Sequence, residues 1–432
     1  MKRLEAFLNK EVSSAPLVAL RIALGVLIAL ELLHFWVNTG FLDNYYFNTN
    51  IHFSFPGFEW VPTLIGGLMK VYVIGLIGLL LVFASGWKFR LVSVVTFFFY
   101  GWFFFMERAA YLNHWYLNLL FLFLLMFLNA ENPIRKVGNW QRLIIIFLIS
   151  AVYFFSGLAK FNADWFSGAT LLMHAENFIG EGRGVLSDVA LNRETMQFVG
   201  IAVALIEVLL PFTLIYKPTR TASFIIAALF HVLNRLLFSI GAFPLVMICI
   251  TALYYNPEQI ERALLRLRIK KANAELPNIK LTKGLAALIS GFVLLQCFLP
   301  LRQHFYSENV LWTDRCVLFS WRMFTAAKKT RMTMFVYHQK TGDIEVYPVE
   351  TLLTNGQISK TMRSPDLILQ TAHLIADKYA EQKKVNIEVH VECENALNGR
   401  PFQKFTDVQR DLLLESRQLF LPYDWIIPLQ EN

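Results

Sequence analysis

Long apolar runs alternate with short polar connections through the first 300 residues of the chain, and the remaining residues show no run of that kind. A helix needs about 20 apolar residues to cross a hydrocarbon core of roughly 30 Å. Nine runs approach that length, at residues 16–36, 68–83, 91–106, 115–128, 143–158, 196–216, 222–237, 242–255 and 284–299. The runs at 115–128 and 242–255 are the weakest. The pattern predicts a polytopic α-helical membrane bundle of about eight or nine transmembrane helices.

The first run follows a basic segment, MKRLEAFLNKEVSSAP, as the apolar region of a secretory signal would. It is longer than such a region, and no small-residue cleavage site comes after it. We therefore expect residues 16–36 to form the first membrane span.

The connections between the runs differ in their content of lysine and arginine. Basic residues are concentrated in alternate connections, at 2–10, 88–90, 135–142, 217–220 and, most densely, 262–283. The other connections carry isolated basic residues, such as Lys70 and Arg108. Because lysine and arginine accumulate on the cytoplasmic side of membrane proteins, we expect a multi-pass inner (plasma) membrane protein with a cytoplasmic N-terminus. A ninth span then places residues 301–432 outside the cytoplasm.

Residues 301–432 have the polarity of a water-soluble domain. Strand-like runs appear in MTMFVYHQ, DIEVYPVE and VNIEVHVEC, and a helical pattern covers residues 365–381. The KTGD between the first two runs is typical of a hairpin turn. The sequence therefore predicts a transmembrane domain over residues 1–300 and a soluble mixed α/β extracytoplasmic domain over residues 301–432.

The composition agrees with a membrane protein. The mean hydropathy is +0.45 and only 17% of residues are charged, against roughly 25% in ordinary soluble domains. The net charge of +8 follows the alternation of the connections, so it indicates topology and contact with anionic membrane lipid rather than binding of nucleic acid.

The sequence contains no HExxH motif, no glycine-rich phosphate loop and no catalytic-serine elbow. The four cysteines lack metal-ligand spacing, and no metal site is expected. Cys249 and Cys297 lie in apolar stretches and are expected to be packing residues. A disulfide between Cys316 and Cys393 is possible if the soluble domain faces an oxidising compartment.

Several polar side chains lie at the ends of the apolar runs, where burial of a polar group is costly and marks a candidate for function. In the predicted topology, His114 lies where the fourth span enters from outside, and Lys160 lies where the fifth leaves to the outside. His231 lies at the outer end of the seventh. Asn113 and Asn234 accompany them. Three helix ends are thus expected to bring two histidines and a lysine to one depth on one side.

Each of these residues also has a structural interpretation. A lysine at the end of a span commonly extends to the membrane interface, and a single histidine there is often only a hydrogen-bonded interfacial residue. Glu31 and His34, one turn apart on the first span, are expected to pair. Glu207 and Arg21 are expected to bridge to neighbouring helices.

The chemistry open to such a site is restricted. A desolvated lysine loses its preference for the charged form, and a neutral amine can act as a general base. Histidines can donate hydrogen bonds to a developing oxyanion. A site between lipid and an external domain suits an amphipathic substrate such as a quinol.

Four segments resemble the vitamin K-dependent γ-glutamyl carboxylase family and its bacterial relatives, which have an HTTM-type membrane domain. They are NHWYLNLLFLFLLMF, YFFSGLAKFNADWFSG, FHVLNRLLFSIGAF and WTDRCVLFSWRMF, in that order along nearly the whole chain. The resemblance implies that a lysine deprotonates reduced vitamin K or menaquinol, and that O2 converts it to an epoxide by way of a strongly basic alkoxide. That base removes a γ-proton from a glutamate of a peptide or protein, and CO2 traps the carbanion.

The resemblance also implies roles for individual residues. Lys160 falls on the catalytic lysine of a G-x-x-K-x-x-A-D-W pattern, and Asn113 and His114 match an Asn-His pair that supports the oxygenation step. The implied quinol-binding residues are His231, Asn234 and Trp165, and the implied substrate-binding residues are Trp321, Met323 and Ser320.

The sequence departs from the animal members at positions that concern the glutamate. Ala159 stands where they have a second lysine, Ala326 where they have a histidine, and Arg322 where they have an acidic residue. The chain is also much shorter than theirs. Two alternatives therefore stay open, a quinol oxygenase or epoxidase without carboxylation, and a non-enzymatic membrane scaffold that uses its outer domain for binding.

Overall fold

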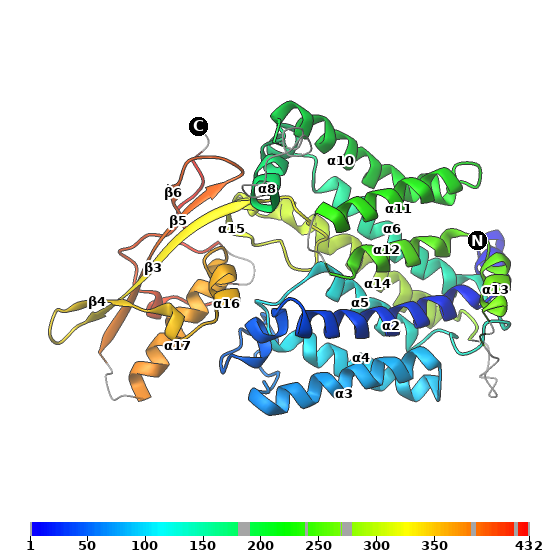
Figure 1. Ribbon diagram of the computed structural model, residues 1–432, viewed down its shortest axis with the longest axis horizontal. Coiled ribbons are helices and arrows are strands. Elements are labelled where there is room, and N and C mark those ends of the chain that lie inside the picture. The colour runs from blue at the N-terminus through cyan, green and yellow to red at the C-terminus, as the bar shows by residue number, and fades with distance from the viewer. Residues whose placement is uncertain are drawn as a thin grey trace.

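The computed structural model describes residues 2–179, 191–237, 241–267, 269, 279–381, 386–418 and 422–430. The chain forms a bundle of helices and, at one end of the bundle, a domain built on an antiparallel sheet (Figure 1). The predicted fold class, a helical membrane bundle followed by a mixed α/β domain, is confirmed.

Each of the nine apolar runs forms a helix. Within the described residues, six helices are long and apolar enough to cross a membrane: α2 (Ala15–Val37), α3 (Gly66–Ser85), α4 (Phe89–Met106), α6 (Asn139–Leu158), α10 (Arg193–Ile215) and α14 (Lys283–Leu301). The two weakest runs form shorter apolar helices, α5 (Asn113–Leu125) and α12 (Phe243–Thr251), the latter extended by a 3-10 turn to Tyr254. The remaining run forms α11 (Arg220–Leu237), which carries arginine near both ends.

Small residues set the closest helix contacts. A Cβ added at Gly25 of α2 would lie 2.6 Å from the carbonyl oxygen of Leu80 on α3. A Cβ added at Gly157 of α6 would lie 2.7 Å from both the backbone nitrogen and Cγ2 of Val208 on α10. Glycine at these positions therefore allows two helix pairs to approach more closely than any larger residue would.

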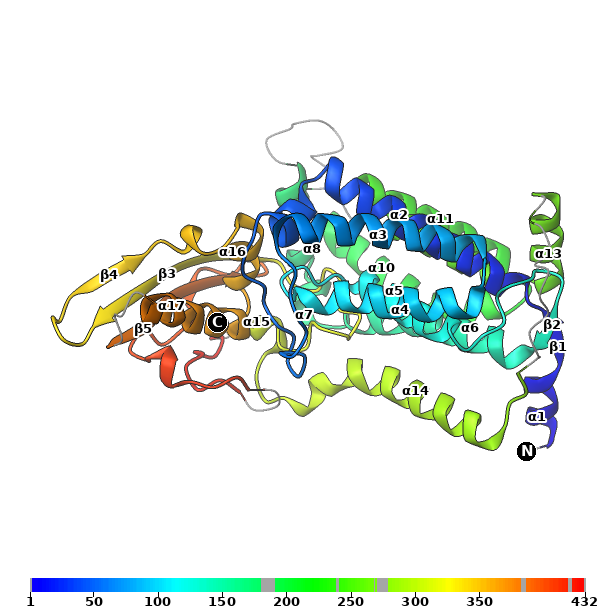
Figure 2. The ribbon, with the colours of Figure 1, turned by 90° about the horizontal axis from the view of Figure 1, so that it is seen from below.

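The end of the bundle opposite the sheet domain carries the basic connections. There β1 (Glu11–Ser13) pairs with β2 (Lys136–Gly138), and the short helices α1 (Lys2–Asn9) and α13 (Pro257–Arg266) lie across the bundle (Figure 2). The structure establishes multiple apolar membrane helices; which end faces the cytoplasm stays a prediction. Arg21 contacts both a neighbouring helix and the connection after α5. Its guanidinium carbon lies 5.9 Å from the ring centroid of Phe89, the first residue of α4, and its Nη1 donates to the carbonyl of Ala130 at 2.5 Å.

The sheet has the order β4-β3-β5-β6. Its strands are β3 (Lys328–His338), β4 (Ile344–Tyr347), β5 (Ile387–Leu397) and β6 (Gln403–Lys404), all antiparallel, with α16 (Asn355–Thr361) and α17 (Pro365–Glu381) in the same domain. The KTGD segment forms the predicted turn between β3 and β4, with Gly342 at φ 77°. Cys316 and Cys393 are buried free thiols, so the disulfide that the sequence allowed is not formed.

Short elements lie where the two parts meet: η1 (Asp43–Phe47), α7 (Ala163–Phe166), α8 (Ala169–Ile179), η3 (Arg302–Phe305) and α15 (Val310–Thr313). Two further short helices, η4 (Val349–Thr351) and η5 (Leu412–Leu414), belong to the sheet domain. Asp164 on α7 accepts hydrogen bonds from both Nη atoms of Arg400, each at 2.7 Å, and from Nδ2 of Asn398 at 2.8 Å. Polar contacts of this kind fix the sheet domain against the adjacent ends of the helices.

One connecting segment departs from ordinary backbone geometry. Between α15 and β3, the non-glycine residues Asp314, Phe319, Trp321 and Phe324 all have φ between 53° and 61°. Left-handed conformations of this kind are unfavourable for bulky side chains and persist where the surrounding packing enforces them, often at functional sites. The packing of the bundle and the sheet domain around this segment therefore fixes the directions of its side chains.

Candidate active site

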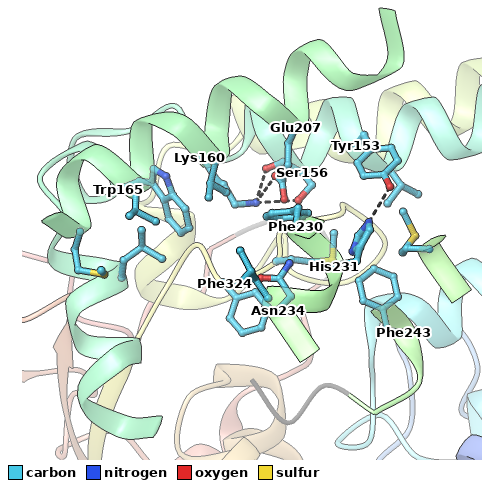
Figure 3. Close-up of a pocket in the computed structure, with 18 of the residues that line it drawn as sticks. Tyr153, Ser156, Lys160, Trp165, Glu207, Phe230, His231, Asn234, Phe243 and Phe324 are labelled. Atoms are coloured by element: carbon cyan, nitrogen blue, oxygen red, sulfur yellow. Dashed lines mark hydrogen bonds and ion pairs between the residues drawn. The ribbon is translucent and has the colours of Figure 1, made fainter. Parts of the chain in front are cut away.

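Lys160 is buried directly after the end of α6. Its side chain is 3% exposed, and its Nζ lies 2.6 Å from Oε2 of Glu207 on α10. The same nitrogen donates to the carbonyl and the hydroxyl of Ser156, at 3.0 and 2.9 Å. Gly157, one residue further along α6, provides the close helix approach that makes the Lys160–Glu207 contact possible. Figure 3 shows Lys160 directed at both partners.

The expected bridge from Glu207 to a neighbouring helix is therefore present, and its partner is the candidate catalytic lysine itself. From the sequence, Lys160 is expected to be a desolvated amine and Glu207 a structural residue. In the structure burial disfavours the lysine charge, and a carboxylate at this distance favours it. The structure thus joins in one contact two residues that the sequence singled out separately.

The pair opens onto a largely apolar cavity of about 220 Å³. The candidate catalytic residue Lys160 lines this cavity together with the three residues that the resemblance implies for quinol binding, Trp165, His231 and Asn234. The ring of Trp165 is 5.3 Å from Nζ of Lys160, and its Nε1 donates to the carbonyl of Gly200. The indole is thereby fixed at one end of the cavity (Figure 3).

His231 lies at the other end of the same cavity. Its Nε2 is 2.8 Å from the hydroxyl of Tyr153, which also bonds the Thr251 hydroxyl at 2.8 Å. The dashed line in Figure 3 marks the Tyr153–His231 contact. Within the described residues, Nδ1 of His231 is buried with no hydrogen-bond partner. Tyr153 thus fixes the imidazole and leaves one ring nitrogen available.

His114 and Asn113 line a different cavity. This second cavity has a volume of about 640 Å³ and lies between the bundle and the sheet domain. Phe243 separates the two, because its ring lies 5.3 Å from that of His114 and 6.2 Å from that of His231. Phe243, Met323 and Phe324 line both cavities. The structure therefore places His114 beside the cavity of Lys160 rather than inside it.

The expected pairing of Glu31 with His34 is wrong. Oε1 of Glu31 accepts from Nε2 of His114 at 3.0 Å and from the backbone nitrogen of Ala242 at 3.1 Å, while Oε2 accepts from Nε1 of Trp115 at 3.2 Å. His34 instead contacts Asn38. The physical reason is that Glu31 faces the bundle interior, where three donors converge. Glu31 thereby orients His114.

The residues proposed for the acceptor substrate are distributed unevenly. Met323 lines both cavities, whereas Trp321 and Ser320 line neither of them. Trp321 is 1% exposed and stacks on Tyr116 with ring centroids 5.1 Å apart. The Ser320 hydroxyl donates to the carbonyl of Cys316. These two residues support the wall, and Arg322, which the sequence singled out only as a departure, faces the second cavity.

Among the described residues, no group of three histidine, cysteine or acidic side chains is placed to hold a metal ion.

Comparison with known families places both parts of the chain. Residues 9–258, more than half of the chain, match the HTTM domain. Residues 281–432 match the vitamin K-dependent gamma-carboxylase lumenal domain. This second match includes helix α14, so the domain boundary that we expect at residue 300 stays a prediction. No solved structure matches the chain. With these two matches in sequence, the chain belongs to the vitamin K-dependent gamma-carboxylase family.

Proposed function

We propose that this chain oxidises a reduced naphthoquinone with O2 to its epoxide and couples that reaction to γ-carboxylation of glutamate in a peptide or protein. The observation that carries the proposal is the Lys160–Glu207 pair, buried at the wall of an apolar cavity. The cavity fits the ring of a naphthoquinol, since aromatic and aliphatic side chains surround one polar end. When bound, the quinol supplies with O2 the strong base that removal of a γ-proton requires.

Lys160 and Glu207 handle the first proton. Nζ of Lys160 takes the hydroxyl proton, and Oε2 of Glu207, 2.6 Å away, stabilises the resulting ammonium. The two Ser156 contacts hold the amine in place. Because the charge stays within the pair, no free ammonium has to form in the apolar cavity.

The remaining residues position the ring and exclude water. Trp165 and Phe230 line the cavity beside the pair, and His231 is oriented by Tyr153. Water exclusion matters because a strong base in contact with water would be quenched before it met the acceptor. The second cavity shares Phe243, Met323 and Phe324 with the first, so an acceptor there lies one wall of side chains away.

The decisive experiment uses the purified chain in lipid nanodiscs with reduced vitamin K or menaquinol, O2, labelled CO2 and a Glu-rich peptide. Epoxide together with fixed label supports the proposal. Epoxide alone favours the quinol oxygenase without carboxylation, and neither product from folded protein favours the scaffold. We expect Lys160→Ala to abolish epoxide formation without affecting membrane insertion. Lys340→Ala, at the exposed turn of the β3–β4 hairpin, is the matched control. Full activity of Lys160→Ala would remove this lysine from the mechanism.

A further inference from the structure

A wall of side chains separates the two cavities. Among the described residues, Phe243, Met323 and Phe324 line both of them. The second cavity reaches the surface of the protein, since the exposed residues Thr39 and Asn44 are part of its lining. Water that enters the second cavity is therefore kept out of the first by this wall.

The wall residues are fixed in different ways. Phe243 is the first residue of α12, and its ring stacks on that of His114 with centroids 5.3 Å apart. Met323 and Phe324 lie instead in the irregular segment between α15 and β3. Phe324 has φ 61°, a conformation that a bulky residue keeps only where contacts around it enforce it. The place of Phe324 in the wall therefore depends on its neighbours.

The chain on either side of Phe324 is anchored. Before it, the buried Trp321 stacks on Tyr116 with ring centroids 5.1 Å apart. After it, the backbone nitrogen of Ala327 donates to Oδ1 of Asn398 at 2.8 Å. Any movement of the wall along this segment is thus confined to the few residues between the two anchors.

His174 on α8 contacts Phe324 in two ways. Its Nε2 lies 3.2 Å from the Phe324 carbonyl oxygen, and the two rings meet edge to face with centroids 5.4 Å apart. Because a carbonyl oxygen can only accept, Nε2 carries the proton. Burial lowers the pKa of His174 more than the bond to Phe324 raises it, so the imidazole is neutral at pH 7 and its one proton lies on Nε2.

The location of His174 suits a contact that holds the wall. Leu171 and Ala175 on the same helix line the first cavity, whereas His174 lines the second. His174 therefore reaches Phe324 from the side that is open to the surface. The net contribution of one hydrogen bond is similar in size to the cost of a left-handed conformation in a non-glycine residue. Loss of the His174 bond is thus enough to let Phe324 leave the wall.

We propose that His174 is a positioning residue, which holds Phe324 across the passage between the two cavities and so keeps water out of the first. The inference rests on the proposed function, because a strong base formed in the first cavity has to reach the acceptor before it meets water. The role requires no proton transfer by His174 itself.

The first test measures water access and requires no turnover. Val152 lines the first cavity and is 1% exposed, so Val152→Cys places a thiol that a charged reagent can reach only through that cavity. The full-length Val152→Cys chain in nanodiscs is treated with a small charged thiosulfonate, and modified cysteines are identified by peptide mass spectrometry. We expect modification at position 152 to be about tenfold faster when His174→Phe is added, the factor that corresponds to one hydrogen bond.

Two further changes separate the hydrogen bond from the ring contact. His174→Phe keeps an aromatic ring but has no donor, whereas His174→Gln keeps an N–H donor near the position of Nε2 without the ring. In the Val152→Cys chain, His174→Gln should therefore leave modification slow, and Phe324→Ala should make it as fast as His174→Phe does. The buried thiol of Cys393 should stay unmodified throughout, as a control for the fold.

Three results would overturn the inference. They are equal rates with and without His174→Phe, a rate in His174→Gln as fast as in His174→Phe, and slow modification in Phe324→Ala, which leaves His174 in place. The last comparison does not depend on the folding of any His174 variant.

The second test uses turnover in the assay with reduced vitamin K, O2, labelled CO2 and a Glu-rich peptide. His174→Phe should form epoxide at a rate close to that of the wild type, whereas fixed label per epoxide should fall by about tenfold. An unchanged ratio in a variant whose first cavity has become accessible would show that the wall does not protect the base, against the inference. If the wild type forms no epoxide, the proposed function fails, while the modification rates still test the wall, so the two failures give different results.

Discussion

Lys160 and Glu207 meet across α6 and α10 with 2.6 Å between Nζ and Oε2, although 47 positions separate them in the chain. Both side chains are buried, at 3% and 6% exposure, beside an apolar cavity. Once Lys160 has taken a proton, the resulting ion pair gains little stability, because desolvation of two charges offsets their attraction. A lysine and a glutamate in an otherwise apolar helix contact are therefore better explained by proton transfer than by folding.

Glu207→Gln tests this explanation. The amide keeps the shape and can still accept a hydrogen bond from Lys160, but it cannot stabilise the ammonium that proton transfer creates. We expect quinol turnover to fall by about 100-fold, the lower end of the range for general acid–base groups, with quinol affinity within a few-fold of the wild type. Turnover in nanodiscs and quinol titration measure the two quantities.

Glu194→Gln on the same helix is the matched control for this change. Glu194 is exposed in the first turn of α10, away from the cavity. It should leave turnover unchanged. An equal loss of turnover in both variants would mean that the helix, not the carboxylate beside Lys160, is responsible.

Gly157→Ala tests the helix approach that creates the pair. The added Cβ would lie 2.7 Å from the backbone nitrogen of Val208, where α10 has to move away. Overpacking of this kind costs about 1–3 kcal/mol of unfolding free energy, and the displaced α10 should also lower quinol turnover. Gly75→Ala on α3 has open space around the new methyl group and should change neither. Denaturation curves and turnover rates of both variants measure these effects. Wild-type stability and turnover in Gly157→Ala would show that the close approach of α6 and α10 is not needed for the Lys160–Glu207 contact.

The fold was largely predictable from the sequence because length and hydropathy decide whether a helix crosses a membrane. Even the two weakest runs form the shorter apolar helices α5 and α12. The strands β3, β4 and β5 followed equally from alternation and from the KTGD turn. Both patterns involve residues close together in the sequence, so they can be recognised without knowledge of the tertiary structure.

The site was predictable only as far as a residue type stood out in its local context. Lysine and histidine at the ends of apolar helices did stand out, and Lys160 and His231 indeed share a cavity. The hydrogen-bond partners of these side chains could not be predicted, because they depend on how each helix is rotated about its axis. Glu31, for example, contacts His114 and not His34, one turn away on the same helix. The charge of Arg322 was visible, but the absence of a hydrogen-bond partner for its Nε and Nη1 among the described residues is a property of the assembled interface.

His114→Ala should lower the rate of turnover more than it weakens quinol binding. The imidazole lines the second cavity and is separated from the Lys160 cavity by Phe243, so the quinol site keeps its walls. Glu31→Gln should give a smaller loss with a changed pH profile, because the carboxylate orients Nε2 of His114. Steady-state rates and quinol titrations at several pH values separate these effects. A pure loss of quinol affinity in His114→Ala would reassign this histidine to quinol binding.

The contact between Asp164 and Arg400 predicts how the junction of bundle and sheet domain responds to acid. Burial alone would raise the pKa of Asp164, but hydrogen bonds from Arg400 and Asn398 outweigh it and hold the pKa below its usual value. A depressed carboxyl pKa stabilises the fold above the unfolded-state value, near 4, and this stabilisation is lost as the pH falls through the lower folded-state value. Asp164→Asn should therefore be less stable than the wild type at pH 7, and its melting temperature should change less between pH 5 and pH 3.

Asp407→Asn is the matched control. The Asp407 carboxylate lies at the surface of the sheet domain, 3.8 Å from Arg410, and this variant should follow the wild-type curve. Parallel melting curves for Asp164→Asn and the wild type over this pH range would show that the Asp164–Arg400 contact contributes nothing to the junction. Trp165, the next residue, would then be held by its bonds to Gly200 and Asn162 and not by the sheet domain.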